Sequence, residues 1–231
     1  YKNMIGDCSA DVVSSTVPCS NKWMVGTLNS FFIGIVATVI ATSLGTLAAL
    51  GLSRPHMPFK GIIMAILISP MIVPLIITAA GMFFFYARIN LVYTFTGVIL
   101  AHVALATPFV VITVTATLVG FDMNMVKAAQ SLGARPVKTF FRVIMPLILP
   151  GIISGALFAF ITSFDEVVIV MFMASLDQLT IPKQMWAGIR QEISPVILCM
   201  ATCLVALSIF LLTTVELLRR RSERLRGIKP R

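Results

Sequence analysis

Five long apolar segments constrain the fold of this chain more than any other feature of the sequence. Each is longer than the roughly 20 apolar residues that an α-helix needs to cross a lipid bilayer. Their apolar residues form continuous runs, whereas the strands of a membrane β-barrel alternate apolar and polar residues. The sequence therefore predicts an all-α membrane protein, whose five transmembrane helices are Val25–Leu52, Gly61–Phe85, Thr94–Val119, Pro146–Ala174 and Pro195–Leu218.

The composition agrees with a membrane location. Only 12% of the 231 residues are charged, which is about half the share in a typical soluble domain, and the mean hydropathy is +0.98. These values exclude a disordered chain, a small disulfide-built secreted domain and an ordinary cytosolic enzyme. A net charge of +9 can indicate nucleic acid or anionic lipid as a partner, so the positions of the basic residues have to decide.

The basic residues are concentrated in every second connection between the segments. Most of them lie after the first segment, after the third, and in the tail that follows the fifth. Because Lys and Arg are retained on the cytoplasmic side of a membrane, we expect these regions to be cytoplasmic. The chain then divides into an extracytoplasmic segment of unknown role (residues 1–22), a membrane domain (23–218) and a basic cytoplasmic tail (219–231). We expect the tail to contact anionic membrane lipid and not nucleic acid.

This orientation places Tyr1 outside the membrane and requires an odd number of spans. The first 22 residues are polar and have no apolar core of a signal peptide, so we expect that the sequence lacks an earlier helix. Cys8 and Cys19 lie in this segment, and an oxidising compartment would allow them to form a disulfide. Two free thiols are an equally good interpretation.

The connection from Gly120 to Met145 carries the most information about function. Asp122 or Asn124 can cap a short helix over Met125–Leu132. Gly133 stands where that helix would end, in the left-handed conformation that Gly adopts at low cost.

A second short helix is expected after this glycine. Pro136 suits its first turn, Val137–Val143 form its body, and Pro146 and Pro150 mark the start of the fourth span. A loop that only links two spans would not need the apolar face formed by Val137, Phe140 and Phe141. Two short amphipathic helices joined by a glycine at the cytoplasmic surface predict a docking element for another protein.

The same connection contains a spaced motif. Its residues are Lys127-Ala128-Ala129, then Gly133 after three residues, and Val143-Ile144-Met145-Pro146 after nine more. The spacing resembles the EAA signature of ABC importer permeases, which is Glu-Ala-Ala, three residues, Gly, nine residues, Ile, any residue, Leu and Pro. Lys127 replaces the acidic residue of that signature. Further segments resemble the spermidine/putrescine class of these permeases: Leu28-Asn29-Ser30, residues 44–49, Pro74, Thr107-Pro108-Phe109, residues 149–152 and residues 163–166.

The resemblance implies a type I ABC importer permease fold with normally six spans, in the inner membrane of a bacterium. In that family the motif forms a coupling helix that sits in a groove of a separate ATP-hydrolysing subunit. The coupling residues carried over to this chain are Lys127, Ala128, Ala129, Leu132, Gly133, Ala134, Phe140 and Pro146. The resemblance also implies a second permease subunit and a periplasmic substrate-binding protein. ATP and Mg²⁺ would bind to the ATPase subunits, since this sequence has no Gly-rich phosphate loop and we expect no catalytic residue in it.

Two adjacent acids, Asp165 and Glu166, interrupt the fourth span in its outer half. A charge at the centre of a membrane helix costs roughly 2.5–3.5 kcal/mol, so two of them are not expected to face lipid. With Phe164 they predict a cation-attracting site in the translocation pathway, and we favour Asp165 as the residue that faces it. A structural pair that is hydrogen-bonded inside the bundle is the alternative.

The sequence therefore predicts a transport subunit for polyamines or a related small organic cation. An ABC permease for another small solute remains open. An ion-coupled secondary transporter is a further alternative, although internal repeats, which are typical of that class, are not evident. His102 is the one histidine in the spans and is too little for an embedded enzyme. The outer connection, Ser175–Ser194, is polar and can form a surface helix that meets a substrate-carrying protein.

Overall fold

The computed structural model describes residues 22–54, 57–120, 124–191 and 195–225, and within these ranges the chain is helical with short connections and no strand. The expectations for residues 1–21, including Cys8 and Cys19, for Asp122 and for the last residues of the tail lie outside the described residues. The described helices are α1 (Lys22–Leu52), α2 (Lys60–Ile72), α3 (Leu75–Arg88), α4 (Phe95–Val119), α5 (Asn124–Ser131), α6 (Pro136–Thr139), the π-turn η2 (Phe140–Ile144), α7 (Met145–Phe164), α8 (Val168–Met173), α9 (Ile181–Gln191) and α10 (Pro195–Leu225).

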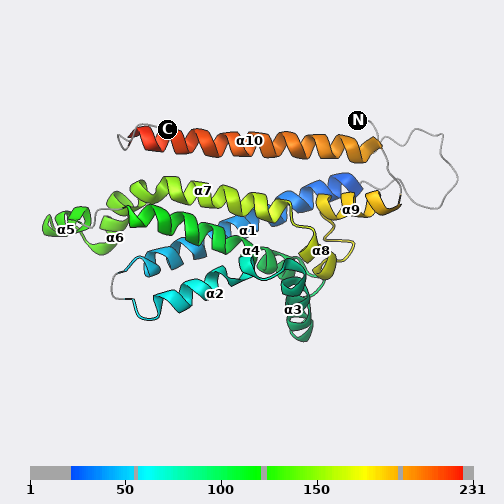
Figure 1. Ribbon diagram of the computed structural model, residues 1–231, viewed down its shortest axis with the longest axis horizontal. Coiled ribbons are helices and arrows are strands. Elements are labelled where there is room, and N and C mark those ends of the chain that lie inside the picture. Colours follow the sequence, from blue (N-terminus) through cyan, green and yellow to red (C-terminus); the bar gives the residue numbers. More distant parts are fainter. Residues whose placement is uncertain (1–21, 55–56, 121–123, 192–194, 226–231) are drawn as a thin grey trace.

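Helix α4 lies at the centre of the bundle and packs against both α1 and α7 (Figure 1). It begins at Thr94, whose side-chain oxygen accepts the Gly97 N–H at 3.0 Å and so caps the helix. Small residues allow its neighbours to approach closely. A Cβ added to Gly45 of α1 would lie 2.7 Å from the Cβ of Val110, and one added to Gly151 of α7 would collide with Thr117. The close approach explains why most of the central part of α4 is buried.

The connections alternate between the two ends of the bundle. The turn between α1 and α2, the α5–α6 region and the C-terminal end of α10 lie at one end, whereas α8 and α9 lie at the other end (Figure 1). This arrangement agrees with the alternation of basic residues in the sequence.

The second predicted span is not one straight helix. It is divided into α2 and α3, which are bent by 104° relative to each other. Val73 at the break is extended, with φ −69° and ψ 136°, because the residue before a proline, here Pro74, is pushed out of the α-helical region. Helix α3 therefore projects sideways from the bundle at the end where α8 lies, and it packs mainly against α8 (Figure 1).

Both predicted ends of the fourth span, Pro146 and Ala174, differ from the helix ends in the structure. The short helix expected over Val137–Val143 is not separate, because α6, η2 and α7 form one continuous helix from Pro136 to Phe164. Pro146 has no N–H to donate to the Arg142 carbonyl, and the preceding turn widens so that Met145 N–H bonds to Phe140 O. At the other boundary the helix ends at Phe164, and the remainder of the predicted span contains the separate helix α8.

Four helical stretches in the described residues are long and apolar enough to cross a membrane: α1, α4, the continuous helix that ends in α7, and α10. The bent pair α2–α3 makes a fifth if it counts as one span. Helix α10 is the most loosely attached of the four. It contacts α7 and α9, and it leaves large apolar side chains such as Leu198, Val205 and Phe210 mainly exposed.

Candidate functional site

The turn after α5 has the geometry that the sequence predicts for its glycine. Gly133 has φ +77°, Gly133 N–H bonds to Gln130 O at 2.9 Å, and Ala134 N–H bonds to Ala129 O at 3.0 Å. This pair of hydrogen bonds is the Schellman arrangement that closes a helix C-terminus. The predicted helix end at Gly133 is confirmed, and α5 and α6 form a compact hairpin.

The α5–α6 hairpin protrudes from the bundle (Figure 1), and it exposes a strip of apolar residues. Val126 and Ala129 are half-buried against the rest of the hairpin, whereas Met125, Ala128 and Leu132 face outward, the last with 88% of its surface exposed. Exposed apolar side chains on a protruding element mark a binding surface more often than they mark a free surface. The other predicted residues of this region are placed as follows: Lys127 exposed on α5, Ala134 half-buried after the turn, Phe140 half-buried in η2, and Pro146 exposed in the first turn of α7.

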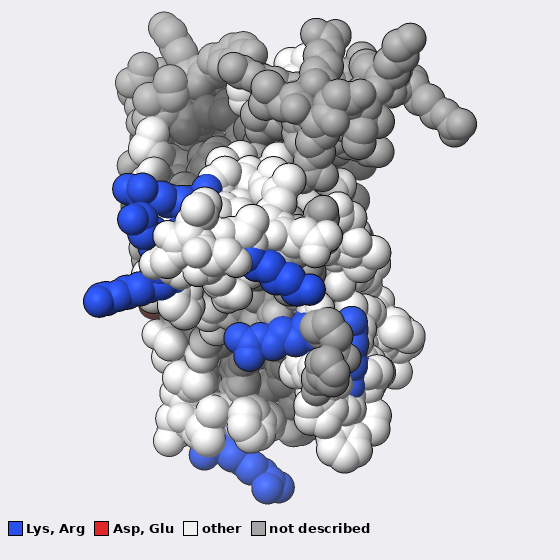
Figure 2. Space-filling model, turned by 90° about the vertical axis from the view of Figure 1, so that its left-hand side faces the viewer, with Lys and Arg blue, Asp and Glu red and all other residues white. Residues whose placement is uncertain are grey.

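Basic side chains surround the hairpin. Figure 2 shows Lys and Arg side chains spread over this end of the molecule. The exposed ones are Arg54, Lys60, Lys127, Arg135, Lys138 and Arg142. This end therefore has a positive potential, and any partner docked there has to accommodate it.

The break between α7 and α8 separates the two predicted acids. Asp165 is the C-cap of α7, with its N–H bonded to Ile161 O, and its side chain is exposed. Glu166 is only 7% exposed and its Oε1 accepts the Ile169 N–H at 2.9 Å. The N-cap residue Val167 makes no side-chain cap bond, so the carboxylate of the residue before it takes the place of a capping side chain. Glu166 therefore caps α8, while Asp165 is left free to meet another group.

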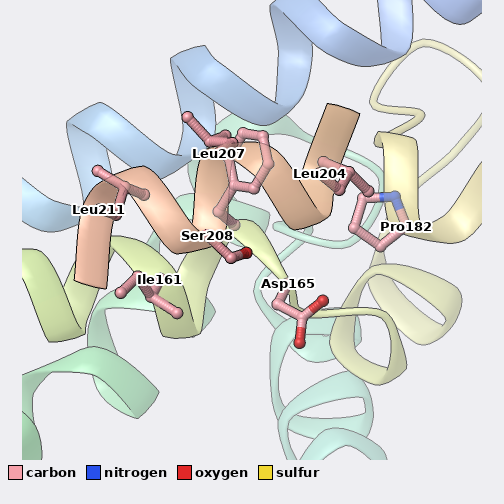
Figure 3. A pocket seen from close by; sticks show the side chains of 8 residues that line it. Ile161, Asp165, Pro182, Leu204, Leu207, Ser208 and Leu211 are labelled. Atoms are coloured by element: carbon pink, nitrogen blue, oxygen red, sulfur yellow. The ribbon is translucent and has the colours of Figure 1, made fainter. Parts of the chain in front are cut away.

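Asp165 borders a recess between three helices. The recess has a volume of about 90 Å³, which is room for on the order of three water molecules. Figure 3 shows the Asp165 side chain beside it, with Pro182 of α9 and side chains of α10 on the other sides. The lining residues are Ile161, Phe164, Asp165, Pro182, Leu204, Leu207, Ser208 and Leu211. Asp165 is the one charged side chain among these lining residues, which favours a small cation in the recess.

Phe164 contributes to the recess but is largely buried. Its ring lies 5.0 Å from that of Phe31 and 5.3 Å from that of Phe160, measured between centroids. At the preceding residue, Ser163 Oγ lies 2.8 Å from Nδ1 of His102. The buried His102 is thus a hydrogen-bonded residue inside the bundle, and the bond joins α4 to the end of α7.

The outer connection forms the amphipathic helix α9, as the sequence suggests. Its first N–H, of Ile181, bonds to Ser30 Oγ at 2.9 Å, and Asn29 Nδ2 donates to Asp177 O and Leu179 O. Two polar residues of α1 thus hold the start of α9. On its outer side the Arg190 guanidinium lies 5.4 Å from the centre of the Trp186 ring.

A family comparison agrees with this architecture. Residues 27–224 match the family described as the binding-protein-dependent transport system inner membrane component. The chain belongs to this family. The permease is therefore a membrane-embedded transport subunit, as the EAA-like spacing predicts.

Two curated relatives have transport names. The permease is 30% identical over 196 residues to the spermidine/putrescine transport system permease protein PotC of Haemophilus influenzae, a match that covers 85% of this chain and 76% of PotC. It is 31% identical over 181 residues to the putrescine transport system permease protein PotI of Escherichia coli K12, covering 75% of this chain and 64% of PotI.

Solved transporters share the fold. A chain of an amino acid ABC transporter matches with a TM-score of 0.65 at 18% identity, over 87% of this chain and 94% of that one. A chain of the inward-facing methionine transporter MetNI matches with a TM-score of 0.64 at 18% identity, over 90% and 96%. The predicted type I ABC importer permease fold is confirmed.

The sequence interpretation found the acids but missed the residues that complete their surroundings. Pro182, Leu204 and Ser208 approach Asp165 only through the packing of α9 and α10 against α7. Asn29 and Ser30 carried a signal, because they belong to a segment that resembles polyamine permeases, but their bonds to the distant α9 have no local trace in the sequence.

Proposed function

We propose that this chain is the membrane-spanning subunit of an ATP-driven importer for putrescine, spermidine or a related small organic cation. The identity to PotC and PotI supports this cargo class. The observation that carries the proposal is the exposed Asp165 carboxylate at an apolar recess near one end of the bundle. A primary ammonium leaves water only where other groups replace its hydration, and a carboxylate beside aromatic rings is suited to this task.

The α5–α6 hairpin is the proposed contact with the ATP-hydrolysing subunit. Its exposed apolar strip supports this assignment, as does the Schellman turn that holds α5 at a set angle. The contact surface comprises Lys127, Ala128, Ala129, Leu132, Gly133 and Ala134, with Phe140 and Pro146 at the base. A pair of such subunits would bind ATP and Mg²⁺ and drive the helices between inward-open and outward-open states.

The remaining partners follow from the same proposal. A second, similar permease would complete the pathway, and a periplasmic binding protein would deliver the cargo at the α8–α9 end. The hairpin end and the basic tail would then lie in the cytoplasm of a bacterium with the chain in its inner membrane. The clustered Lys and Arg residues at that end support this orientation.

The assembly is tested by a tagged pull-down from native membranes in mild detergent, with partners identified by mass spectrometry. Recovery of a nucleotide-binding subunit together with a second permease is the expected result. A chain that is inserted but recovered alone would contradict the proposal and favour an ion-coupled secondary transporter. If the complete complex takes up a different solute, the chain is still an importer subunit, but the polyamine assignment is wrong.

The cargo contact is tested by uptake of labelled putrescine in cells that lack other polyamine transporters. Asp165→Asn removes the charge and should raise KM about tenfold or more, since a hydrogen bond to a charged group is worth roughly 1.5–3 kcal/mol. Glu166→Gln keeps an oxygen that accepts the Ile169 N–H, and its KM should stay close to that of the original chain. Asp177→Asn changes an exposed acid outside the recess and serves as the control. If Glu166→Gln is the more damaging of the two, the assignment of Asp165 is wrong.

A further inference from the structure

Helix α8 is too short to be stable by itself. It contains six residues, Val168–Met173, whereas isolated helices shorter than about 12 residues are marginal in water. Its apolar side chains Ile169, Val170 and Met173 are fully buried, but burial does not satisfy the free N–H and C=O groups at its two ends. These groups need partners from elsewhere in the chain.

The two ends of α8 are closed by side chains of opposite charge. At the N-terminal end, Glu166 Oε1 accepts the Ile169 N–H at 2.9 Å. At the C-terminal end, the Lys183 ammonium donates to Ala174 O at 2.8 Å and to Val170 O at 3.3 Å. The negative group at the N-terminus and the positive group at the C-terminus both match the helix dipole.

Lys183 is well placed to hold α8, because the start of α9 is itself held. The Ile181 N–H bonds to Ser30 Oγ, and Asn29 bonds to the two carbonyls just before α9. Lys183 follows two residues after Ile181. Burial lowers the pKa of its ammonium group, and the Ala174 and Val170 carbonyl oxygens replace part of the water that this group has lost.

Successive residues of α9 contact the two sides of the α7–α8 break. Pro182 lines the recess of Asp165, and Lys183 binds the far end of α8. Glu166, which binds the N-terminal end of α8, is the residue next to Asp165 in the chain. A shift of α8 would therefore pull on Asp165, while Pro182 limits the space into which its side chain can move.

We propose that Lys183 is a positioning residue for cation transport, which holds α8 so that the α7–α8 break presents Asp165 to the recess. The inference rests on the proposed function, because it assigns Asp165 as the group that meets the cargo. It goes beyond that function by adding α9 to the cargo site. Lys183 does not touch the cargo in this scheme and acts through Asp165.

The first test compares three variants in the complete transporter by putrescine uptake, normalised to the amount of inserted chain. Lys183→Met keeps the aliphatic stem without the ammonium and should raise KM about tenfold, as when a charge-assisted contact is partly lost, while Vmax stays within a factor of about two. Lys183→Arg can still donate to both carbonyls and should restore a KM close to the original. Arg190→Met removes an exposed cation of the same helix that contacts Trp186 and should leave KM unchanged.

An unchanged KM for inserted Lys183→Met would overturn the inference. An equal rise in Arg190→Met would overturn it as well, since the effect would then belong to α9 charge in general. If Lys183→Met is not inserted, Lys183→Gln retains an N–H donor and is used in its place. KM values that rise from the original chain and Lys183→Arg to Lys183→Gln are then the supporting result, and equal KM values for Gln and the original chain are the contrary one.

A second measurement separates this inference from the cargo assignment. Asp165→Cys is introduced into the chain, and the rate of its reaction with an uncharged methanethiosulfonate is followed in membranes. The reaction of the four cysteines that the chain already has is measured in the chain without the substitution and subtracted. Adding Lys183→Met should change this rate at least fivefold, and adding Lys183→Arg should not. A rate that is independent of residue 183 refutes the positioning role, even if putrescine is the cargo. A changed rate in a chain that transports no polyamine supports the positioning role and rejects only the cargo.

Discussion

Replacing Gly133 by alanine should weaken the α5–α6 hairpin by a predictable amount. The residue has φ +77°, and a left-handed conformation costs a residue with a Cβ roughly 1–2 kcal/mol. An added Cβ would meet no atom within 4 Å, so there is no clash to add and no contact to offset the cost. A change of one or two kcal/mol corresponds to about a 5–30-fold change in the ratio of closed to open hairpin.

Hydrogen exchange of the α5–α6 peptide measures this ratio directly. In Gly133→Ala, protection of the two amides that close the turn, Gly133 and Ala134 in the original chain, should fall by that factor. Gly61→Ala is the matched control, because its Cβ also meets nothing within 4 Å and its φ is not positive. Protection of the hairpin that is the same in both variants would refute the reasoning. Recovery of the ATPase in the pull-down should fall in parallel if the hairpin is the coupling element.

Three further variants test other contacts. Ser163→Ala leaves Nδ1 of the buried His102 without its partner and should destabilise the solubilised chain by about 1–3 kcal/mol; an unchanged thermal midpoint would contradict this. Gly45→Ala places a Cβ 2.7 Å from that of Val110 and should cost about 1–3 kcal/mol, and adding Val110→Gly, which removes that Cβ, should recover part of the loss. Failure of the second substitution to recover stability would show that the α1–α4 contact is not the cause. Lys127→Glu should reduce recovery of the ATPase several-fold, whereas Lys60→Glu, at the same end but outside the hairpin, should not, and equal effects would indicate a general response to charge.

Much of the fold was predictable because membrane spans and helix ends are local signals. The apolar runs predicted α1, α4 and α10 within a few residues at most of their ends, and Gly133 marked the end of α5. The type I permease fold was predictable from the resemblance of the motif spacing to that family. In each case the information lies within a few turns of the helix concerned.

The wrong helix boundaries arose where one local sequence signal is compatible with two different structures. Pro70 and Pro74 both lie in the second apolar run, and a proline can either bend a membrane helix or divide it. The sequence alone does not decide between a bend and a division, because the outcome depends on whether α3 can pack against another helix. In the structure α3 packs against α8. Likewise, Pro146 suggested the start of a helix, but the π-turn before it allows the helix to continue.

The candidate site was only half predictable for a similar reason. Hydropathy identified Asp165 and Glu166 as unusual, and the preference for Asp165 agrees with its exposed side chain. The different environments of the two acids result from the end of α7, which leaves the Asp165 carboxylate exposed at the recess and directs the Glu166 carboxylate to the Ile169 N–H of α8. Lys183 gave no signal, since a lysine in a polar outer connection is ordinary.

The two functional ends of this chain are built in physically different ways. The hairpin turn at Gly133 depends on one residue whose surroundings are open, so its geometry is encoded locally and does not need neighbours. The α7–α8 break contains no glycine and depends on Ser30, Glu166 and Lys183, which come from three parts of the chain. Its geometry therefore changes whenever α1 or α9 moves relative to α7. An importer of the proposed kind requires this combination, because force has to enter through an element that keeps its shape, whereas the cargo contact has to change as the helices tilt.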